Sequence, residues 1–297
     1  MGAAGALGLA AAPDAPTAPE ALTISTWRTK RTFRTDDVTI RSPMRRILVT
    51  NDDGYFSPGI RALADALRDL GEVTIVAPQT EASAVGHALT LRRPLRLEPV
   101  GERMYAVDGT PTDCVNLGLN EVLGGRVDLV VSGINMGLNI GDDVTYSGTV
   151  AGALEGALLG IQAIAVSLEY TRDAWDFTPA ATLAASIAGA LLATPLPFRT
   201  FLNVNVPLGA IKGMRVTVQA VRNHVTQIDR RLDPRGRPYF WVEEAQDEWQ
   251  PLENSDYQAI HDGMVSITPL QPDLTHHSAL GLVQALTQAA SAGTGVR

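Results

Sequence analysis

The sequence has a single cysteine, Cys114, which excludes an intrachain disulfide and a metal cluster held by cysteines. It fits a reducing, cytoplasmic setting. No uninterrupted apolar run reaches the roughly 18 residues that a membrane-spanning helix needs. We therefore expect a cytoplasmic protein that has no membrane partner.

Positive charge is also scarce. The formal net charge is -8, and only two lysines, Lys30 and Lys212, accompany the arginines. This balance argues against a nucleic-acid partner, because a nucleic-acid groove needs a basic face. A phosphate-bearing substrate would meet a repulsive average field. Its binding therefore requires a local cation, either an arginine or a metal ion.

The chain divides into an N-terminal extension and one domain. The first 43 residues are rich in Ala, Pro and Thr and show no amphipathic pattern, which predicts a disordered extension. Hydrophobic residues make up 45% of the chain, enough apolar mass for a large core. We expect residues 44–297 to form a single α/β domain, with a hairpin excursion at about 216–244.

From residue 46, strand-like apolar runs alternate with helical patterns, which predicts α/β architecture with a Rossmann-like, mostly parallel sheet flanked by helices. The first helix is marked by Ser57 as N-cap, Pro58 in the first turn and Gly71 at the end. The expected strands are 47–50, 73–77, 104–107, 127–131, 163–168, 201–206 and 265–268, and later helices are expected to begin at Thr110 and to span 150–160 and 182–192.

After about residue 215 the alternation stops. A turn signal at 233–236 separates the segments 216–228 and 238–242, which predicts a projecting C-terminal β-hairpin. The aromatic run at 239–241 suggests burial of the hairpin against a partner subunit. The spacing equally allows the hairpin to fold on the chain's own core.

The polar segments of interest directly follow the predicted strands. In an open parallel sheet, ligands bind beyond the carboxyl ends of the strands. Segments 51–53, 79–87 and 132–143 each follow a strand and are polar or rich in glycine. We expect all three to face the same crevice.

Asp52 and Asp53 are adjacent carboxylates that repel each other unless a cation lies between them. Oxygen ligands select hard ions such as Mg²⁺ or Mn²⁺. The alternative is an ordinary turn in which one of the two acids caps the following helix. The pair alone leaves both interpretations open.

The segment 133–143 has glycines at three positions, which allow its backbone to approach a ligand closely. Asn135 and Asn139 add amide oxygens and amide donors. The spacing is not that of the dinucleotide-binding fingerprint. A plain glycine-rich turn remains the alternative.

Ser147, Gly148 and Thr149 stand at a helix start, where unpaired N–H groups and the helix dipole attract anions. Ordinary capping by Ser147 is the alternative. Ser83 offers a hydroxyl to a metal, and His87 is either a proton donor or an exposed loop histidine. A metal site and an anion site on one sheet edge together describe phosphate hydrolysis.

The motifs now resemble the survival protein E (SurE) family of nucleotidases over about residues 44 to 285, in that family's order. The segments that carry the resemblance are 47–54, 77–78, 83, 86–87, 109–114, 132–135 with Gly137, Asn139 and Gly141, 146–150, 233–238 and 263–270.

The resemblance implies a Rossmann-like sheet whose C-terminal hairpin is swapped in a homodimer or homotetramer. It implies a metal-dependent phosphatase for nucleoside 5′- and 3′-monophosphates, and sometimes for short polyphosphate. The implied cofactor is one divalent ion, Mg²⁺ or Mn²⁺, per subunit. The implied site residues are Asp52 and Asp53 as catalytic groups, Asp52, Asp53, Ser83 and Asn135 as metal ligands, and Asn139, Ser147, Gly148 and Thr149 as phosphate contacts.

Two other functions remain as alternatives. Phospho-accepting signalling modules also place an acidic pair after the first strand, but they need a nearby lysine, and neither Lys30 nor Lys212 is suitably placed. A phosphate- or nucleotide-binding protein without turnover is the other alternative. Release of phosphate from a nucleoside monophosphate separates the three.

Overall fold

The computed structural model describes residues 44–172, 174–223, 226–244, 248–250 and 252–294. The extension expected at 1–43 lies outside the described residues. The helices are α1 (Pro58–Leu67), α2 (Pro111–Leu117), α3 (Gly148–Leu158), α4 (Thr178–Ala193), α5 (Asp256–His261) and α6 (Leu280–Thr294). The strands are β1 (Arg46–Thr50), β2 (Glu72–Pro78), β3 (Leu97–Gly101), β4 (Met104–Val107), β5 (Leu129–Met136), β6 (Gln162–Leu168), β7 (Phe201–Val206), β8 (Met214–Val216), β9 (Arg222–Asn223), β10 (Thr226–Leu232), β11 (Pro238–Glu244), β12 (Glu248–Trp249) and β13 (Val265–Leu270).

Nine of these strands form one sheet in the order β3-β4-β2-β1-β5-β6-β7-β13-β8. Most neighbours are parallel; β3 runs antiparallel to β4, and β13 runs antiparallel to β7. β1 pairs in parallel with both β2 and β5. The strand order therefore reverses at β1, and a sheet of this kind has its ligand crevice at such a reversal. The expected fold class is confirmed.

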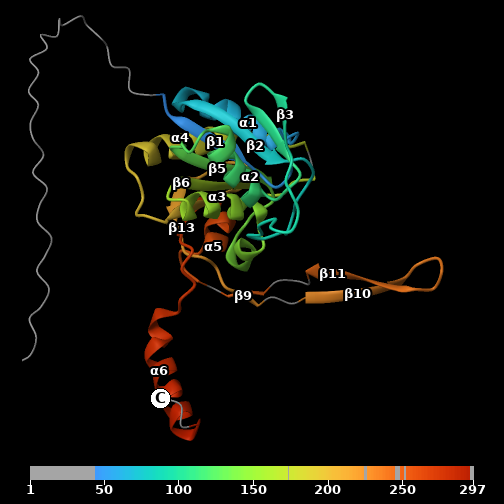
Figure 1. Ribbon diagram of the computed structural model, residues 1–297, viewed down its shortest axis with the longest axis vertical. Coiled ribbons are helices and arrows are strands. Elements are labelled where there is room, and N and C mark those ends of the chain that lie inside the picture. Colours follow the sequence, from blue (N-terminus) through green and yellow to red (C-terminus); the bar gives the residue numbers. More distant parts are fainter. Residues whose placement is uncertain (1–43, 173, 224–225, 245–247, 251, 295–297) are drawn as a thin grey trace, which may run out of the picture. The chain divides into compact units, whose positions relative to one another are not determined.

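Helices cover both faces of the sheet (Figure 1). One core cluster contains residues of α1 and α4, and the other contains residues of α2 and α3. The Ser57 side chain caps α1 as expected, and Thr110 forms a capping box with Asp113 at the start of α2. The strands between the helix layers are buried because their β-branched and aliphatic residues face apolar side chains on both sides.

Glycines bring α3 unusually close to the sheet. A Cβ added at Gly152 would lie 2.8 Å from Ser132 Oγ, and one at Gly156 would lie 2.9 Å from Val130 Cβ. Both contacts are too short for real atoms. The face of α3 that carries Gly152 and Gly156 therefore determines how closely the helix packs against β1 and β5.

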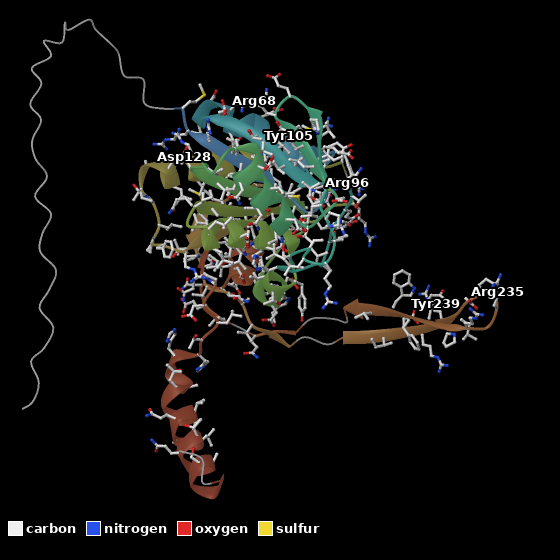
Figure 2. All side chains as sticks on the ribbon, viewed as in Figure 1. Arg68, Arg96, Tyr105, Asp128, Arg235 and Tyr239 are labelled. Carbon is white, nitrogen blue, oxygen red and sulfur yellow. The ribbon has the colours of Figure 1, made fainter. Side chains whose placement is uncertain are left out.

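The hairpin forms as predicted. β10 and β11 pair in antiparallel register around the turn at 233–236, and Tyr239 is labelled on the hairpin in Figure 2. Phe240 and Trp241 are 57% and 55% exposed. The alternative interpretation, in which the hairpin packs these aromatic residues on the chain's own core, is therefore wrong. Burial against a partner stays a prediction.

Several boundaries differ from the sequence expectations. β5 continues to Met136, into the segment expected to be a loop, and Gly133 takes a positive φ of 135° that favours glycine. In place of one long strand at 216–228, the structure has the shorter β8, β9 and β10. β3 and α6 were not expected, because β3 is a mostly exposed edge strand containing Pro99 and α6 follows no clear start signal.

No helix among the described residues is both long and apolar enough to cross a bilayer.

The tight fit of α3 predicts opposite effects for two glycine-to-alanine changes. Gly156→Ala must push against Val130, and overpacking of this kind costs about 1–3 kcal/mol, more than the roughly 1 kcal/mol gained in helix propensity. Gly189→Ala in α4 meets only Leu70 at an ordinary 3.4 Å and keeps the propensity gain. Thermal unfolding should therefore show a lower Tm for Gly156→Ala and no decrease for Gly189→Ala. Equal effects would contradict this account of α3 packing.

Candidate functional site

The loops that follow β1, β2 and β5 and the segment that follows β6 line one cavity of about 470 Å³. It contains six of the eight residues that the sequence assigned to the site: Asp52, Asp53, Ser83, Asn135, Asn139 and Ser147. Gly148 and Thr149 are not among the described residues that line it. The sheet edge thus brings together the predicted metal ligands from the loops after β1 and β2 and from the end of β5.

Gly148 and Thr149 lie behind Asp52. The Thr149 hydroxyl donates a hydrogen bond to Asp52 Oδ1, and a Cβ at Gly148 would lie 2.8 Å from Asp52 Cβ. Asp52 is 5% exposed. In this arrangement Thr149 orients the carboxylate and Gly148 leaves room for it. Contact of Gly148 and Thr149 with phosphate stays a prediction. It would be made by their backbone N–H groups at the start of α3.

The surroundings of Asp52 and Asp53 disfavour the ionised form of each carboxylate. Burial raises the pKa of Asp52, with its hydrogen bond from Thr149 acting in the opposite direction. Burial, followed by the negative charges of Asp52 and Glu81, raises the pKa of Asp53 to about 7. Desolvation and like charge both favour the neutral acid. A bound cation would reverse this preference.

Asp53 also has an unsatisfied atom. Its Oδ2 is buried and has no hydrogen-bond partner among the described residues. Leaving a buried polar oxygen without a partner is costly, and a cation in the cavity would satisfy it. This orphaned oxygen is the strongest structural indication that the site fits a metal ion.

The neutral ligands complete an oxygen-rich set. The Ser83 hydroxyl donates to Glu81 Oε1 at 2.7 Å, and Asn135 Nδ2 donates to the Gly137 carbonyl at 2.9 Å. Neither bond uses the Asn135 amide oxygen. No group of three or more His, Cys, Asp or Glu side chains that could hold a metal occurs within the described part of the chain. A cation here would therefore depend on Ser83 and Asn135 as well as on the aspartates.

Asn139 lines the cavity, and hydrogen bonds with residues of β6 and β7 hold both its backbone and its side chain. Its backbone N–H donates to Asn205 Oδ1 at 2.8 Å, and its carbonyl accepts from Asn203 Nδ2 at 2.8 Å and from Asn205 Nδ2 at 3.1 Å. Its side chain donates to Ser167 Oγ at 2.7 Å. The sequence reasoning missed Asn203 and Asn205. Two asparagines within the apolar strand at 201–206 were the signal that could have revealed them.

The far end of the glycine-rich loop is fixed by a buried acid. Asp256 Oδ2 accepts from the Gly141 N–H at 3.0 Å, and its Oδ1 accepts from the Ala220 N–H at 2.9 Å. Gln219 Nε2 donates to the Gly141 carbonyl at 2.8 Å. Gly141 is thereby held on both its N–H and its carbonyl. Sequence reasoning missed Asp256, because nothing local links α5 to a loop more than a hundred residues away.

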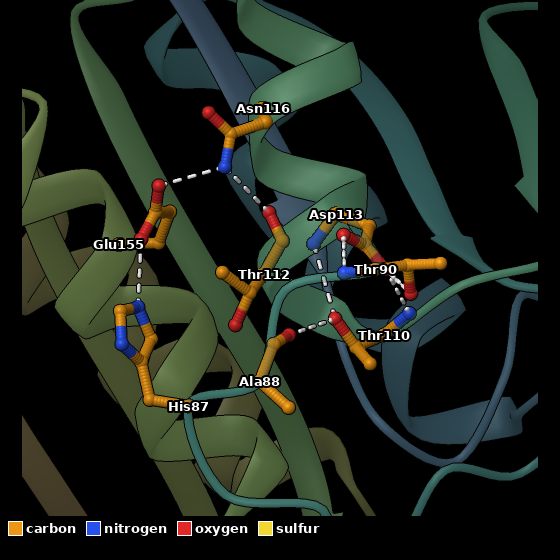
Figure 3. Close-up of polar contacts among 8 residues, drawn as sticks. All are labelled: His87, Ala88, Thr90, Thr110, Thr112, Asp113, Asn116 and Glu155. Atoms are coloured by element: carbon orange, nitrogen blue, oxygen red, sulfur yellow. Dashed lines mark hydrogen bonds and ion pairs between the residues drawn. The ribbon is translucent and has the colours of Figure 1, made fainter. Parts of the chain in front are cut away.

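His87 is an exposed loop residue, one of the two roles considered from the sequence, and its ring is also held by a contact to α3. Its Nε2 lies 2.6 Å from Glu155 Oε2, and Asn116 Nδ2 donates to Glu155 Oε1 at 2.7 Å (Figure 3). The neighbouring Gly86 N–H donates to the Tyr146 carbonyl at 2.9 Å. These contacts fasten the loop that carries Ser83 to α3. We therefore interpret His87 as a positioning residue.

The raised pKa of Asp53 predicts how metal-free stability depends on pH. Because the folded-state pKa of Asp53 is about 7 and the ordinary pKa of an aspartate is 3.8, the folded state binds a proton more tightly than the unfolded state over this interval. Metal-free stability should decrease as pH rises from about 4 to about 7. Asp53→Asn should flatten the decrease, measured by urea unfolding in a chelator at several pH values. The exposed Asp65→Asn serves as control. Parallel profiles for wild type and Asp53→Asn would contradict the prediction.

The site's sequence segments also match known proteins. The sequence profile of the family described as "Survival protein SurE" matches residues 47–226.

Curated relatives are similar over most of the chain. A protein of Geobacter metallireducens named 5′-nucleotidase SurE is 50% identical over 238 residues, which are 79% of this chain and 94% of the relative. A protein of Thermus thermophilus named 5′-nucleotidase SurE 1 is 49% identical over 249 residues, 82% of this chain and 98% of the relative.

A solved structure agrees with these sequence matches. The crystal structure of the SurE protein from Aquifex aeolicus superposes with a TM-score of 0.73 at 43% sequence identity and covers 82% of this chain and 99% of that one. The family profile, the curated relatives and the solved structure all carry the SurE name, so this chain belongs to the survival protein SurE family.

Proposed function

We propose that this chain is a metal-dependent 5′-nucleotidase that hydrolyses nucleoside 5′-monophosphates to nucleoside and phosphate. The proposal extends to 3′-monophosphates and short polyphosphate as further substrates. The observation that carries it is the buried, unpartnered Asp53 Oδ2 beside Asp52, at the edge of a cavity that also receives the start of α3. The names of the relatives support the choice of substrate.

In this proposal one divalent ion, Mg²⁺ or Mn²⁺, is held by the carboxylates of Asp52 and Asp53, the Ser83 hydroxyl and the Asn135 amide oxygen. When bound, such an ion neutralises phosphoryl charge and acidifies a water molecule. The protein's own part is to hold its oxygen ligands in place. Thr149 fixes Asp52 by its hydroxyl, and the Asn135 amide is oriented by its bond to Gly137.

The phosphate of the substrate would lie at the start of α3. Ser147 lines the cavity, and its hydroxyl accepts from the Val150 N–H at 3.1 Å. The remaining N–H groups and the helix dipole there favour an anion. Asp52, Asp53 and Glu81 would repel the same phosphate without a cation. Binding of the metal and binding of the substrate are therefore expected to be coupled.

A phosphate-binding protein without turnover is the second candidate, and the acidic pair alone would fit it. A phospho-accepting module fits the structure less well. Lys212 donates to the Asp262 carbonyl at 2.9 Å and is not among the described residues that line the cavity. Measuring phosphate release from AMP and GMP with Mn²⁺ tests the proposal. A protein that binds AMP without releasing phosphate would support the second candidate.

Neutralising either aspartate is expected to abolish turnover. Asp52→Asn and Asp53→Asn each remove a charge that the cation needs, and phosphate release should fall by about 100-fold or more at limiting Mn²⁺. Both variants should stay folded, since amides fit the same space and relieve the repulsion. Asp65→Asn on the exposed face of α1 should keep wild-type activity. Full activity of either active-site variant at limiting Mn²⁺ would refute the assignment.

We also propose that the chain forms a homodimer or homotetramer. Besides the exposed aromatic residues of the hairpin, α6 exposes Leu282, Val283 and Leu286 at 66%, 50% and 60%. Exposed apolar patches of this kind mark interaction surfaces. The expected compartment is the cytoplasm, in keeping with Cys114 as a free, buried thiol.

Removing the hairpin should lower the oligomeric state. We expect a variant in which a short Gly-Ser linker replaces residues 228–244 to sediment with a smaller mass than the wild type, because it loses Phe240 and Trp241. Arg235→Ala at the turn removes no apolar surface and should sediment as the wild type does. A wild-type protein that is monomeric at micromolar concentration would contradict the proposal.

A further inference from the structure

One wall of the cavity is aromatic. Tyr170 and Trp175 line the same cavity as Asp52 and Asp53. Tyr170 is 63% exposed, so a large part of its side chain is open to a ligand. Neither residue belongs to the proposed metal or phosphate site. We therefore expect the aromatic wall to contact a part of the ligand other than its phosphate.

The sheet register places Tyr170 close to the metal ligands. Met136 at the end of β5 pairs with Leu168 at the end of β6, and the Gly137 N–H donates to the Leu168 carbonyl at 2.9 Å. Tyr170 follows Leu168 by two residues. It therefore leaves the sheet beside the end of β5, which carries Asn135.

The separation across the sheet suits a nucleotide. β1, β5 and β6 are consecutive neighbours, so β6 runs two strand spacings, about 10 Å, from β1. Thr50 at the end of β1 is level with Ala165, and β6 continues three residues further to Leu168. A substrate with its phosphate near Asp52 and Asp53 would direct its other end along this edge toward Tyr170. In a nucleoside monophosphate the ribose spans that interval, and the base stands at the far end.

Tyr170 is supported by rings that reach into the core. Its ring centroid lies 5.8 Å from that of Trp175 in an edge arrangement, and Trp175 stacks on Phe177 at 5.5 Å with an interplanar angle of 11°. Phe177 is 5% exposed. The backbone before Tyr170 is also fixed, because the Glu169 N–H donates to the Val206 carbonyl at 2.9 Å.

We propose that Tyr170, held by Trp175 and Phe177, is the platform on which the nucleobase of the substrate stacks. This inference rests on the proposed nucleotidase function and assigns the residue that distinguishes a nucleotide from other phosphate monoesters. Stacking on an aromatic ring tolerates every base, because each base has a π-face. Purines, which have the larger face, should bind more tightly than pyrimidines. Met136, 38% exposed in the same cavity, adds a polarisable contact.

The test compares a substrate that has a base with one that lacks it. Tyr170→Ala should raise KM for AMP by about ten-fold, equivalent to about 1.4 kcal/mol, with little change in kcat. It should leave hydrolysis of ribose 5-phosphate unchanged, and Tyr170→Phe should retain the wild-type KM for AMP. Phe198→Ala, which removes an exposed ring outside this cavity, should behave as the wild type.

Calorimetry with adenosine gives a second measurement that does not depend on catalysis. Adenosine should bind the wild type and Tyr170→Phe, and about ten-fold more weakly Tyr170→Ala. Unchanged AMP kinetics in Tyr170→Ala would overturn the inference, as would an equal loss on ribose 5-phosphate or an absence of adenosine binding to the wild type. Failure of the wild type to release phosphate from any monophosphate would instead overturn the proposed function, and adenosine binding would still decide the role of Tyr170.

Discussion

The burial of two adjacent carboxylates at the end of the central strand β1 is the constraint on which the rest of the site depends. Desolvation opposes the ionisation of both Asp52 and Asp53, and the negative charges of Asp52 and Glu81 oppose that of Asp53 further. Glycine at 148 is what allows the start of α3 to approach Asp52 so closely. The protein therefore maintains an arrangement that is unfavourable by itself and that a bound cation would stabilise. Such an arrangement is typical of sites selected for function rather than for stability.

The loops around this pair are fixed from outside the cavity. Glu155 holds His87 and with it the loop that carries Ser83, while Asp256 holds Gly141 at the far end of the glycine-rich loop. Asn205 binds the backbone of Asn139 in between. None of these three contacts uses a proposed metal ligand. They position the ligands before any cation or substrate binds, which lowers the cost of ordering the site.

Local sequence patterns predicted most of the sheet, because most of its strands are short apolar or β-branched runs. They also predicted the helix starts that have a side-chain cap, as at Ser57 and Thr110. The same rule of strand ends predicted which loops meet in the cavity. Contacts between distant segments could not be predicted in this way. Asp256 acts on a loop far away in sequence, and Thr149 turned out to bind Asp52 because α3 packs so tightly. β5 also continues beyond its apolar run, since pairing with β6 extends to Met136.

The phosphatase activity proposed for this chain depends on a cation at Asp52 and Asp53. The most direct test is X-ray diffraction from crystals grown with Mn²⁺, with data collected at the manganese absorption edge. We expect one anomalous peak per chain, within coordination distance of Asp53 Oδ2 and in contact with Asp52, Ser83 and Asn135. A map without anomalous density between these residues, or with manganese bound only elsewhere on the chain, would contradict the central claim.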